Sequence, residues 1–219
     1  MIESDSISDA WEATLDLFSE PKRLNRFDSM RGPCVEYEDL LIKISKPRHN
    51  EPISALYPSA FKTFVNSYAD GFLGGEAARH STVSQRLYSW QLRDTKKMQV
   101  ADKTLDQIAR AVDNLKEHPE SRYNIVGFWD PQIDPDLPNP VSPLAAYFRI
   151  RSHALHSSLM VRSVDAWLGA FPMFVGFSML HDHLARMTNN DQGSIAFFIL
   201  SYHVYEMDLP VIQMMRSDL

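Results

Sequence analysis

Two pairs of polar residues in the second half of the chain have the types and the spacing needed to bind an anionic ligand. Arg162 and Ser163 are adjacent, and a guanidinium fork binds an oxyanion through two parallel hydrogen bonds, to which a hydroxyl can add another. His203 and Tyr205 are two positions apart, so on a strand both side chains point to one face and can meet one ligand hydroxyl. The simpler interpretations are a surface arginine at a strand end and a partly buried histidine beside a core tyrosine.

Ser142 lies in the proline-containing segment PNPVSPLAAYFRI (138–150) and is a weak candidate for a nucleophile. A serine hydroxyl is hard to ionise at neutral pH and needs a general base, and none is adjacent to it in the sequence. The chain has no Gly-x-Ser-x-Gly turn, no Walker A loop and no dinucleotide-binding fingerprint. Cys34, the single cysteine, belongs to the N-terminal region, and we expect it to be a small apolar packing residue.

The histidines outside SYHVY do not predict a metal site. His181 and His183 flank Asp182, but neighbours on a helix differ by about 100° in direction, so the two imidazoles do not share a face. His153 and His156 flank an expected turn, and we expect both to be solvated.

Composition indicates one ordinary globular domain, residues 1–219, with 44% hydrophobic and 23% charged residues. The net charge of −6 argues against a broad nucleic-acid surface, which needs an excess of Lys and Arg. The N-terminus lacks the basic start of a signal peptide, and no apolar run reaches the roughly 18 residues that span a bilayer. We therefore expect a cytoplasmic protein that binds neither nucleic acid nor membrane.

The hydrophobic pattern predicts helices combined with a sheet, an α/β (α+β) fold. Helices are predicted over 6–19, 61–75, 102–116 and 172–187. Strands are predicted over 35–44, 123–129 and 145–163, the last being two strands around a turn near Ser152–His153. Loops are predicted over 20–34, 46–52 and 130–143, and the pattern of 76–90 assigns no structure.

Three segments resemble signatures of thymidylate synthase and its relatives, the deoxycytidylate hydroxymethylases. They are SRYNIVGFWDP (121–131), RSVDAWLGAFP (162–172) followed by an apolar helix, and SYHVY (201–205). Their order and separations are similar to those of the family from about Leu115 to Tyr205. Residues 1–100 resemble the family only loosely, best over LYSWQLR.

The resemblance implies a thymidylate-synthase-like sandwich whose central sheet packs on helices and against the same sheet of a second subunit, hence a homodimer. Members of this family bind a pyrimidine nucleotide. A thiolate adds to C6 of the ring, and C5 then accepts a one-carbon unit from 5,10-methylenetetrahydrofolate.

The resemblance also implies roles for individual residues. Arg162 and Ser163 match the pair that binds the phosphate, and His203 and Tyr205 match the pair that binds the sugar 3′-hydroxyl. Arg122 matches the first of two adjacent arginines that reach the phosphate across the dimer interface.

Further matches are less complete. Tyr123 replaces the second arginine of that pair, so one cationic contact is expected to be absent. An arginine near the N-terminus also binds the phosphate in the family, and Arg26 and Arg31 are both candidates. Asp165 matches an aspartate that contacts the folate pterin, and Tyr88 matches a tyrosine that lines the nucleotide cleft.

Three departures from the family pattern concern the chemistry. Ser142 stands at the position of the catalytic cysteine, and Pro143 replaces the histidine that usually follows it. Met173 stands where the family has an asparagine, or an aspartate, that binds the base edge. The sequence continues only to Leu219, so the tail that closes over the folate in the family is expected to be absent, which makes folate binding doubtful.

The residues leave three functions open. The chain can be a transferase acting at C5 of a uridylate- or cytidylate-like nucleotide, or an enzyme with changed chemistry on a related nucleotide. It can also be a catalytically inactive nucleotide-binding subunit, pairing with itself or with an active paralogue.

Overall fold

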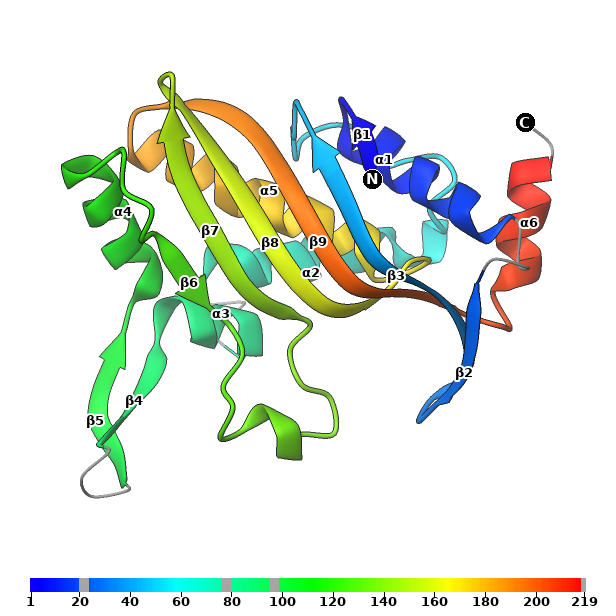
Figure 1. Cartoon of the computed structure of the whole chain (residues 1–219), viewed down its shortest axis with the longest axis horizontal. Coiled ribbons are helices and arrows are strands. Elements are labelled where there is room, and N and C mark those ends of the chain that lie inside the picture. The colour runs from blue at the N-terminus through cyan, green and yellow to red at the C-terminus, as the bar shows by residue number, and fades with distance from the viewer. Residues whose placement is uncertain (20–23, 76–79, 95–98, 218–219) are drawn as a thin grey trace.

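The computed structural model describes residues 1–19, 24–75, 80–94 and 99–217. Its strands are β1 (Ile2–Ser4), β2 (Asn25–Ser29), β3 (Gly32–Ile44), β4 (Trp90–Asp94), β5 (Gln99–Leu105), β6 (Ile125–Gly127), β7 (Pro143–Arg151), β8 (Ala154–Asp165) and β9 (Asp191–Tyr205). Within these residues the main sheet has seven strands in the order β1-β3-β9-β8-β7-β6, with β2 also paired to β3 (Figure 1). Strands β4 and β5 form a separate two-stranded sheet.

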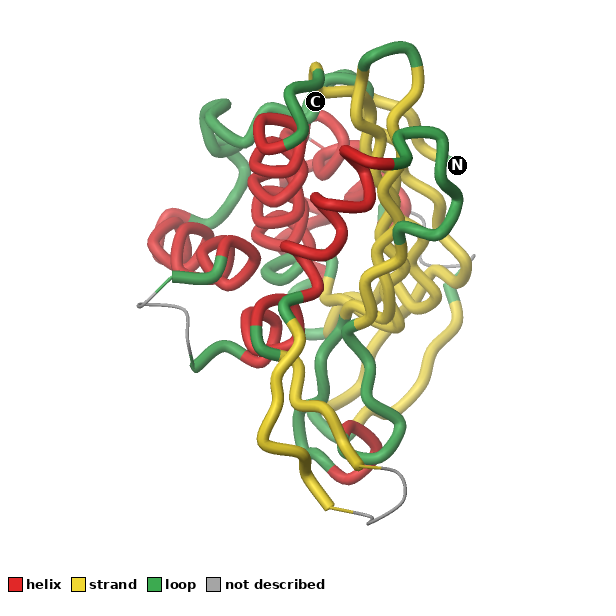
Figure 2. Tube along the Cα trace, turned by 90° about the vertical axis from the view of Figure 1, so that its left-hand side faces the viewer, coloured by secondary structure: helices red, strands yellow, loops and turns green. Residues whose placement is uncertain are grey.

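The helices cover one face of the main sheet, as Figure 2 shows, and leave the other face open. They are α1 (Ile7–Leu15), α2 (Lys62–Leu73), α3 (Thr82–Tyr88), α4 (Gln107–Glu117), α5 (Ala170–Met187) and α6 (Leu209–Ser217). Helix α5 is apolar on most sides because it is buried between the sheet and α2, and the aromatic rings of Phe174 and Phe197 meet at 4.4 Å. The predicted α/β (α+β) sandwich with a sheet packed on helices is confirmed.

The open face of the sheet carries apolar side chains. Along β8, Leu159 and Val161 are buried under the helices, whereas Met160 between them is 41% exposed. Met160 pairs in register with Phe198 on β9, which pairs with the exposed Leu41 on β3. An apolar row therefore crosses three neighbouring strands on the side that no helix covers in the described part of the chain.

The N-terminal helix is tied to the segment between β8 and α5. The indole of Trp11 is fully buried, and its Nε1 donates a hydrogen bond to the carbonyl of Ala166 at 2.8 Å. The same indole stacks on Trp167 and meets Phe171 edge to face. This contact fixes the turn at which β8 ends and α5 begins.

Several predicted elements are confirmed: α1, α2, β3, α5 and the β7–β8 hairpin, whose turn places Ser152 and His153 at positive φ. Others were wrong. The predicted loop 20–34 contains β2, because residues 25–29 pair with the start of β3. Helix α4 begins later than residue 102, because residues up to Leu105 pair with β4 and the Asp106 carboxylate caps the helix at Ala109. Helices α3 and α6 and strand β4 were not predicted.

Candidate functional site

Most of the predicted site residues line one cavity of about 810 Å³. Its walls come from the ends of β8 and β9, the start of α5, one side of α2, the β2–β3 turn and the loop before β7. The predicted residues among its lining are Ser142, Arg162, Ser163, Asp165, Met173, His203 and Tyr205.

Arg162 forms one end of this cavity together with the loop before β7. Its Nε donates to the carbonyl of Val141 at 2.9 Å, and its Nη2 donates to the carbonyl of Pro140 at 2.8 Å. Burial lowers the pKa of the Arg162 guanidinium, and the carboxylate of Asp134 opposes that shift. Because Nη1 makes no hydrogen bond within the described residues, it can face an anionic ligand.

The structure separates the two N-terminal arginine candidates. Arg31 lines the cavity, and its Nη2 donates to Oδ1 of Asn139 at 3.0 Å on the same loop that contacts Arg162. Arg26 instead forms a 2.8 Å ion pair with Glu206 and does not line the cavity. Arg31 and Arg162 therefore make one end of the cavity cationic.

Ser163, His203 and Tyr205 lie side by side because β8 and β9 are parallel neighbours. The Ser163 hydroxyl and Nδ1 of His203 are 3.2 Å apart, and the rings of His203 and Tyr205 are perpendicular at 5.5 Å. Burial lowers the pKa of His203, so its imidazole is neutral at pH 7. Ser163, His203 and Tyr205 can therefore donate hydrogen bonds to a ligand hydroxyl, or accept them from it, without adding a charge to the cavity.

Asp165 supplies the only carboxylate among the lining residues in the described part of the chain. Its two oxygens accept the backbone N–H groups of Trp167 at 3.0 Å and Leu168 at 3.2 Å, which holds the side chain at the end of β8. Burial raises the pKa of Asp165 to about 6, despite these hydrogen bonds. The group can therefore gain or lose a proton near neutral pH.

Another part of the cavity lining is apolar and aromatic. Met173 is buried at the start of α5, and Leu168 precedes it in the turn. Phe61, Phe64 and Tyr68 come from the first turns of α2 and the residue before it. A flat ring fits such a wall, but a thioether does not distinguish donors from acceptors on the ring edge.

Ser142 lies where the loop meets β7, and its carbonyl accepts the backbone N–H of Arg162 at 2.9 Å. Its hydroxyl makes no hydrogen bond within residues 1–19, 24–75, 80–94 and 99–217, so no base in that part of the chain activates it. Cys34 is buried and does not line the cavity, and burial raises the pKa of its thiol. The thiol is therefore not placed to replace the hydroxyl as a nucleophile.

The family model described as thymidylate synthase matches residues 60–217. The chain belongs to the thymidylate synthase family.

Relatives of this family come from archaea and bacteria. The "Putative thymidylate synthase" of Methanosarcina mazei is 27% identical over 217 residues, which cover 97% of this chain and 93% of that protein. The protein of the same name from Methanothermobacter marburgensis is 33% identical over 104 residues, covering 48% and 47%. The thymidylate synthase of Leuconostoc mesenteroides is 29% identical over 116 residues, covering 53% of this chain and 36% of that protein.

Membership of the thymidylate synthase family supports a nucleotide-binding role of the C5-transferase type. The family typically uses methylenetetrahydrofolate and is typically dimeric. In this member, Arg162, Ser163, His203 and Tyr205 match the family pattern, whereas Ser142 and Met173 depart from it.

Two predicted residues of the thymidylate synthase pattern lie outside the cavity. Tyr88 was expected to line it, but its hydroxyl donates to the carbonyl of Phe72 at 2.9 Å and its ring packs over Gly74. Gly74 has φ +70°, and an added Cβ would come within 2.6 Å of the Tyr88 ring. The absence of a side chain at Gly74 therefore leaves the space that the ring occupies beside the end of α2. Arg122 is exposed just before β6 and also does not line the cavity of its own chain.

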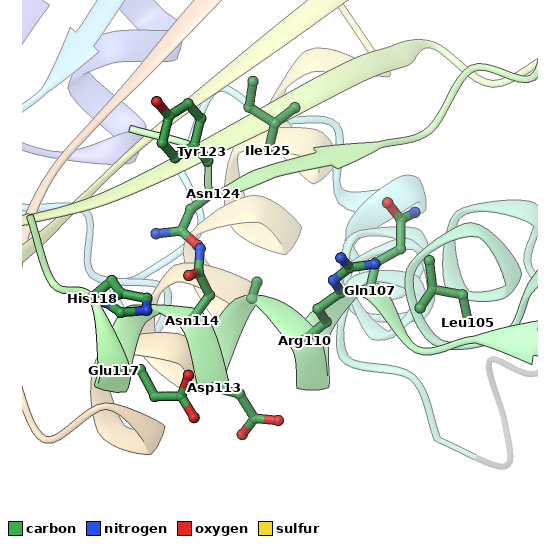
Figure 3. Close-up of a pocket in the computed structure, with 11 residues that line it drawn as sticks. Leu105, Gln107, Arg110, Asp113, Asn114, Glu117, His118, Tyr123, Asn124 and Ile125 are labelled. Atoms are coloured by element: carbon green, nitrogen blue, oxygen red, sulfur yellow. The ribbon is translucent and has the colours of Figure 1, made fainter. Parts of the chain in front are cut away.

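A second cavity of about 580 Å³ lies between α4 and β6 (Figure 3). The side chains of Asn114 and Asn124 meet in its wall, where Nδ2 of Asn114 donates to Oδ1 of Asn124. Tyr123, which replaces the second arginine of the family pair, is 82% exposed at its rim. None of the residues predicted to bind the nucleotide lines this cavity.

His181 and His156 are held by hydrogen bonds within the fold. Nδ1 of His181 lies 2.7 Å from the Ser157 hydroxyl in the core, and Asp182 pairs with Arg186 at 2.7 Å. His156 is half-buried rather than fully solvated, and its Nδ1 accepts the backbone N–H of Ser194. No cluster of three or more His, Cys, Asp or Glu residues in the described ranges is arranged to hold a metal ion. Among the same residues, no helix has the length and apolar character needed to cross a membrane.

Proposed function

We propose that the cavity binds a pyrimidine nucleoside 5′-monophosphate and that the protein is a transferase acting at C5 of the ring. In this proposal Arg162, Arg31 and Ser163 bind the phosphate. His203 and Tyr205 bind a sugar hydroxyl, and the ring lies toward Met173.

The observation that carries this proposal is the meeting of Arg162, Ser163, His203 and Tyr205 in one cavity, although they come from two strands separated by α5. The cationic end fits a phosphate dianion, and the His203–Tyr205 pair on β9 fits a hydroxyl. The apolar end fits a flat ring.

The same cavity has features that suit a one-carbon cofactor of the folate class. Phe64 and Leu168 offer apolar surface to a ring system, and the Asp165 carboxylate can accept hydrogen bonds from the N–H groups of a pterin. Such a cofactor would supply the one-carbon unit. We propose methylenetetrahydrofolate on this basis, with Asp165 as the residue that orients it.

The open face of the sheet supports the proposal of a homodimer. The row of Leu41, Phe198 and Met160 offers apolar surface of the kind that dimer interfaces bury. Arg122 is exposed beyond the sheet edge, and in the proposed dimer it reaches the phosphate of the other subunit.

A second candidate function is favoured by the environment of Ser142. A hydroxyl with no base beside it adds to C6 far less readily than a thiolate. Met173 also offers the ring edge no hydrogen bond. These two observations favour a nucleotide-binding subunit without the usual covalent step, or an enzyme with changed chemistry on a modified nucleotide.

The first test is a thermal-shift panel with dUMP, dCMP, UMP, CMP, dTMP and purine monophosphates. A ligand that binds only the folded protein raises its melting temperature in proportion to ln(1 + [L]/Kd). A rise with one pyrimidine monophosphate that is lost in Arg162→Ala supports the site, and no rise with any of them refutes it.

Release of tritium from the C5-labelled ligand in the presence of folate then separates the two candidates. Release by the wild-type protein supports the transferase. Release only after Ser142→Cys supports a binding subunit that lacks just its nucleophile, and no release from either protein refutes the transferase.

A further inference from the structure

One wall of the cavity is formed by residues 137–142, which lack the backbone hydrogen bonds of a helix or a strand. Residues 137–142 belong to no helix or strand, yet they contribute Leu137, Asn139 and Ser142 to the cavity lining. Pro138 and Pro140 have no backbone N–H to donate. In the described part of the chain, backbone hydrogen bonds hold only its two ends, from the Leu137 N–H to the Asp134 carbonyl and from the Arg162 N–H to the Ser142 carbonyl, so between them the wall depends on side-chain contacts.

The base of the segment is held by a buried arginine outside the cavity. Nη1 of Arg86 lies 3.3 Å from Oδ2 of Asp130, and Nη2 lies 3.1 Å from Oδ1 of Asp134. Asp134 is fully buried, and its other oxygen accepts the backbone N–H of Asp130 at 2.6 Å. One guanidinium thus joins both ends of the turn from which the wall begins.

Arg86 lies on α3 and is connected to β4, to α4 and, through α4, to β6. Its guanidinium lies over the ring of Trp90 at 4.9 Å, where β4 begins. Its carbonyl on α3 accepts Nε2 of Gln107 at 2.7 Å, and the Gln107 amide also bonds the N–H and the C=O of Gly127 on β6. The turn is therefore anchored to α3, to α4 and to the edge of the main sheet.

Stability alone gives a weak account of this cluster. Buried charges lose their hydration, and replacing a buried ion pair with apolar residues is often neutral or stabilising. Nε of Arg86 is buried and has no hydrogen-bond partner in the described part of the chain, which is a further cost. A fork that holds two carboxylates at fixed positions is better suited to setting geometry.

We propose that Arg86 is a positioning residue for the anion-binding end of the cavity. By fixing Asp130 and Asp134, it sets the wall so that Pro140 and Val141 meet the Arg162 guanidinium and Asn139 meets Arg31. It also neutralises the Asp134 carboxylate near Arg162, which leaves Arg162 available to a ligand. This inference rests on the proposed function, in which Arg162 and Arg31 bind a phosphate.

The test variant is Arg86→Lys, which keeps the charge but loses the fork. The dissociation constants of the pyrimidine monophosphate selected by the thermal-shift panel and of the matching nucleoside are measured by calorimetry. We expect monophosphate binding to weaken by about tenfold, as for one misplaced charge-assisted contact, and nucleoside binding by less than about threefold. Equal losses for both ligands, or no loss, would overturn the inference.

The matched control is Arg216→Lys, because Arg216 also forks onto a carboxylate, that of Asp16, but lies on α6. It should leave both constants unchanged. If Arg86→Lys does not fold, Asp130→Asn removes one arm of the cluster and is judged by the same ratio.

Hydrogen exchange without ligand separates failure of this inference from failure of the proposed function. If Arg86 positions the wall, the amides of Leu137 and Arg162, which donate to the Asp134 and Ser142 carbonyls, exchange faster in Arg86→Lys than in wild type, whether or not a nucleotide binds. Unchanged exchange overturns the positioning role. Faster exchange in a protein whose wild type binds no monophosphate retains that role and refutes only the proposed function.

Discussion

The two ends of the cavity are built differently. At the polar end, Arg162, Ser163 and His203 stand on β8 and β9, and the ladder between these strands fixes their separation. Around the proposed ring position, Met173 comes from the start of α5, and Ser142 comes from the loop that also contacts Arg162. The polar end keeps the residue types that the thymidylate synthase family pattern leads one to expect, whereas the ring end departs from them.

This difference indicates which property is retained. Residues on paired strands keep their relative positions through backbone hydrogen bonds, so the proposed phosphate and sugar contacts do not depend on the chemistry at the ring. A change from thiol to hydroxyl and from amide to thioether alters reactivity and recognition of the base without disturbing that ladder. The proposed binding and the proposed catalysis can therefore be tested separately.

The largest effect is expected from removing the cation of the polar end. Arg162→Ala should weaken binding of the pyrimidine monophosphate by about 100-fold or more, because it removes a charge-assisted contact in a partly buried site. Calorimetric titration measures this loss. Arg26→Ala is the matched control, since Arg26 pairs with Glu206 away from the cavity and its loss should change affinity by less than about twofold. Equal losses in both variants would refute the division into two ends.

A second prediction concerns pH and the Asp165 carboxylate. Burial raises its pKa from about 3.8 to about 6, so the folded state binds the proton more tightly than the unfolded state. Its contribution to stability is therefore present below about pH 4 and is lost as pH rises through about 6. The loss amounts to about 2 kcal/mol, allowing for partial exposure.

The measurement compares the free energy of unfolding of wild type and Asp165→Asn between pH 4.5 and 7.5. Comparing the two proteins removes the opposite contribution of His203, whose pKa burial lowers. The stability of the wild type relative to the variant should fall over this range. Parallel pH profiles would mean that Asp165 is not held in a desolvated position.

The same contrast explains how much of the site could be predicted from the sequence. Residues two apart on a strand must share a face, so His203 and Tyr205 were brought together as predicted. The wall formed by Phe61, Phe64 and Tyr68 was missed, although these aromatic residues lie apart from the core stripe of Val65, Ala69 and Phe72. That second aromatic stripe was a usable signal.

Other features depended on tertiary contacts that no local pattern contains. Helix α4 starts after Asp106 rather than at residue 102 because residues up to Leu105 pair with β4. That pairing, and not the pattern of 102–116 itself, makes these residues a strand. The choice of Arg31 over Arg26 depends on the β2–β3 turn, which the sequence pattern did not predict. Tyr88 turned away from the cavity because Gly74 leaves room for its ring.

A third prediction tests the ring end. Met173→Asn introduces an amide that can donate to or accept from the ring edge, and it should raise the discrimination between uridylate and cytidylate to about tenfold. Met173→Leu, which keeps the site apolar, should leave discrimination at the wild-type level. Paired dissociation constants for dUMP and dCMP measure the effect. An equal gain in both variants would show that residue 173 acts through packing rather than through its polar group.

The smallest effect is expected from changes at two tyrosines, Tyr68 on α2 and Tyr88 at the end of α3. Tyr88→Phe removes the hydrogen bond to the Phe72 carbonyl and should lower the free energy of unfolding by about 1 kcal/mol, with ligand affinity unchanged. Tyr68 lines the cavity, and its hydroxyl makes no hydrogen bond within the described residues, so Tyr68→Phe should leave stability nearly unchanged and alter affinity by a fewfold. Urea unfolding and calorimetry on both variants check this crossed pattern. A loss of affinity in Tyr88→Phe would place that tyrosine in the cleft after all, as the family pattern predicts.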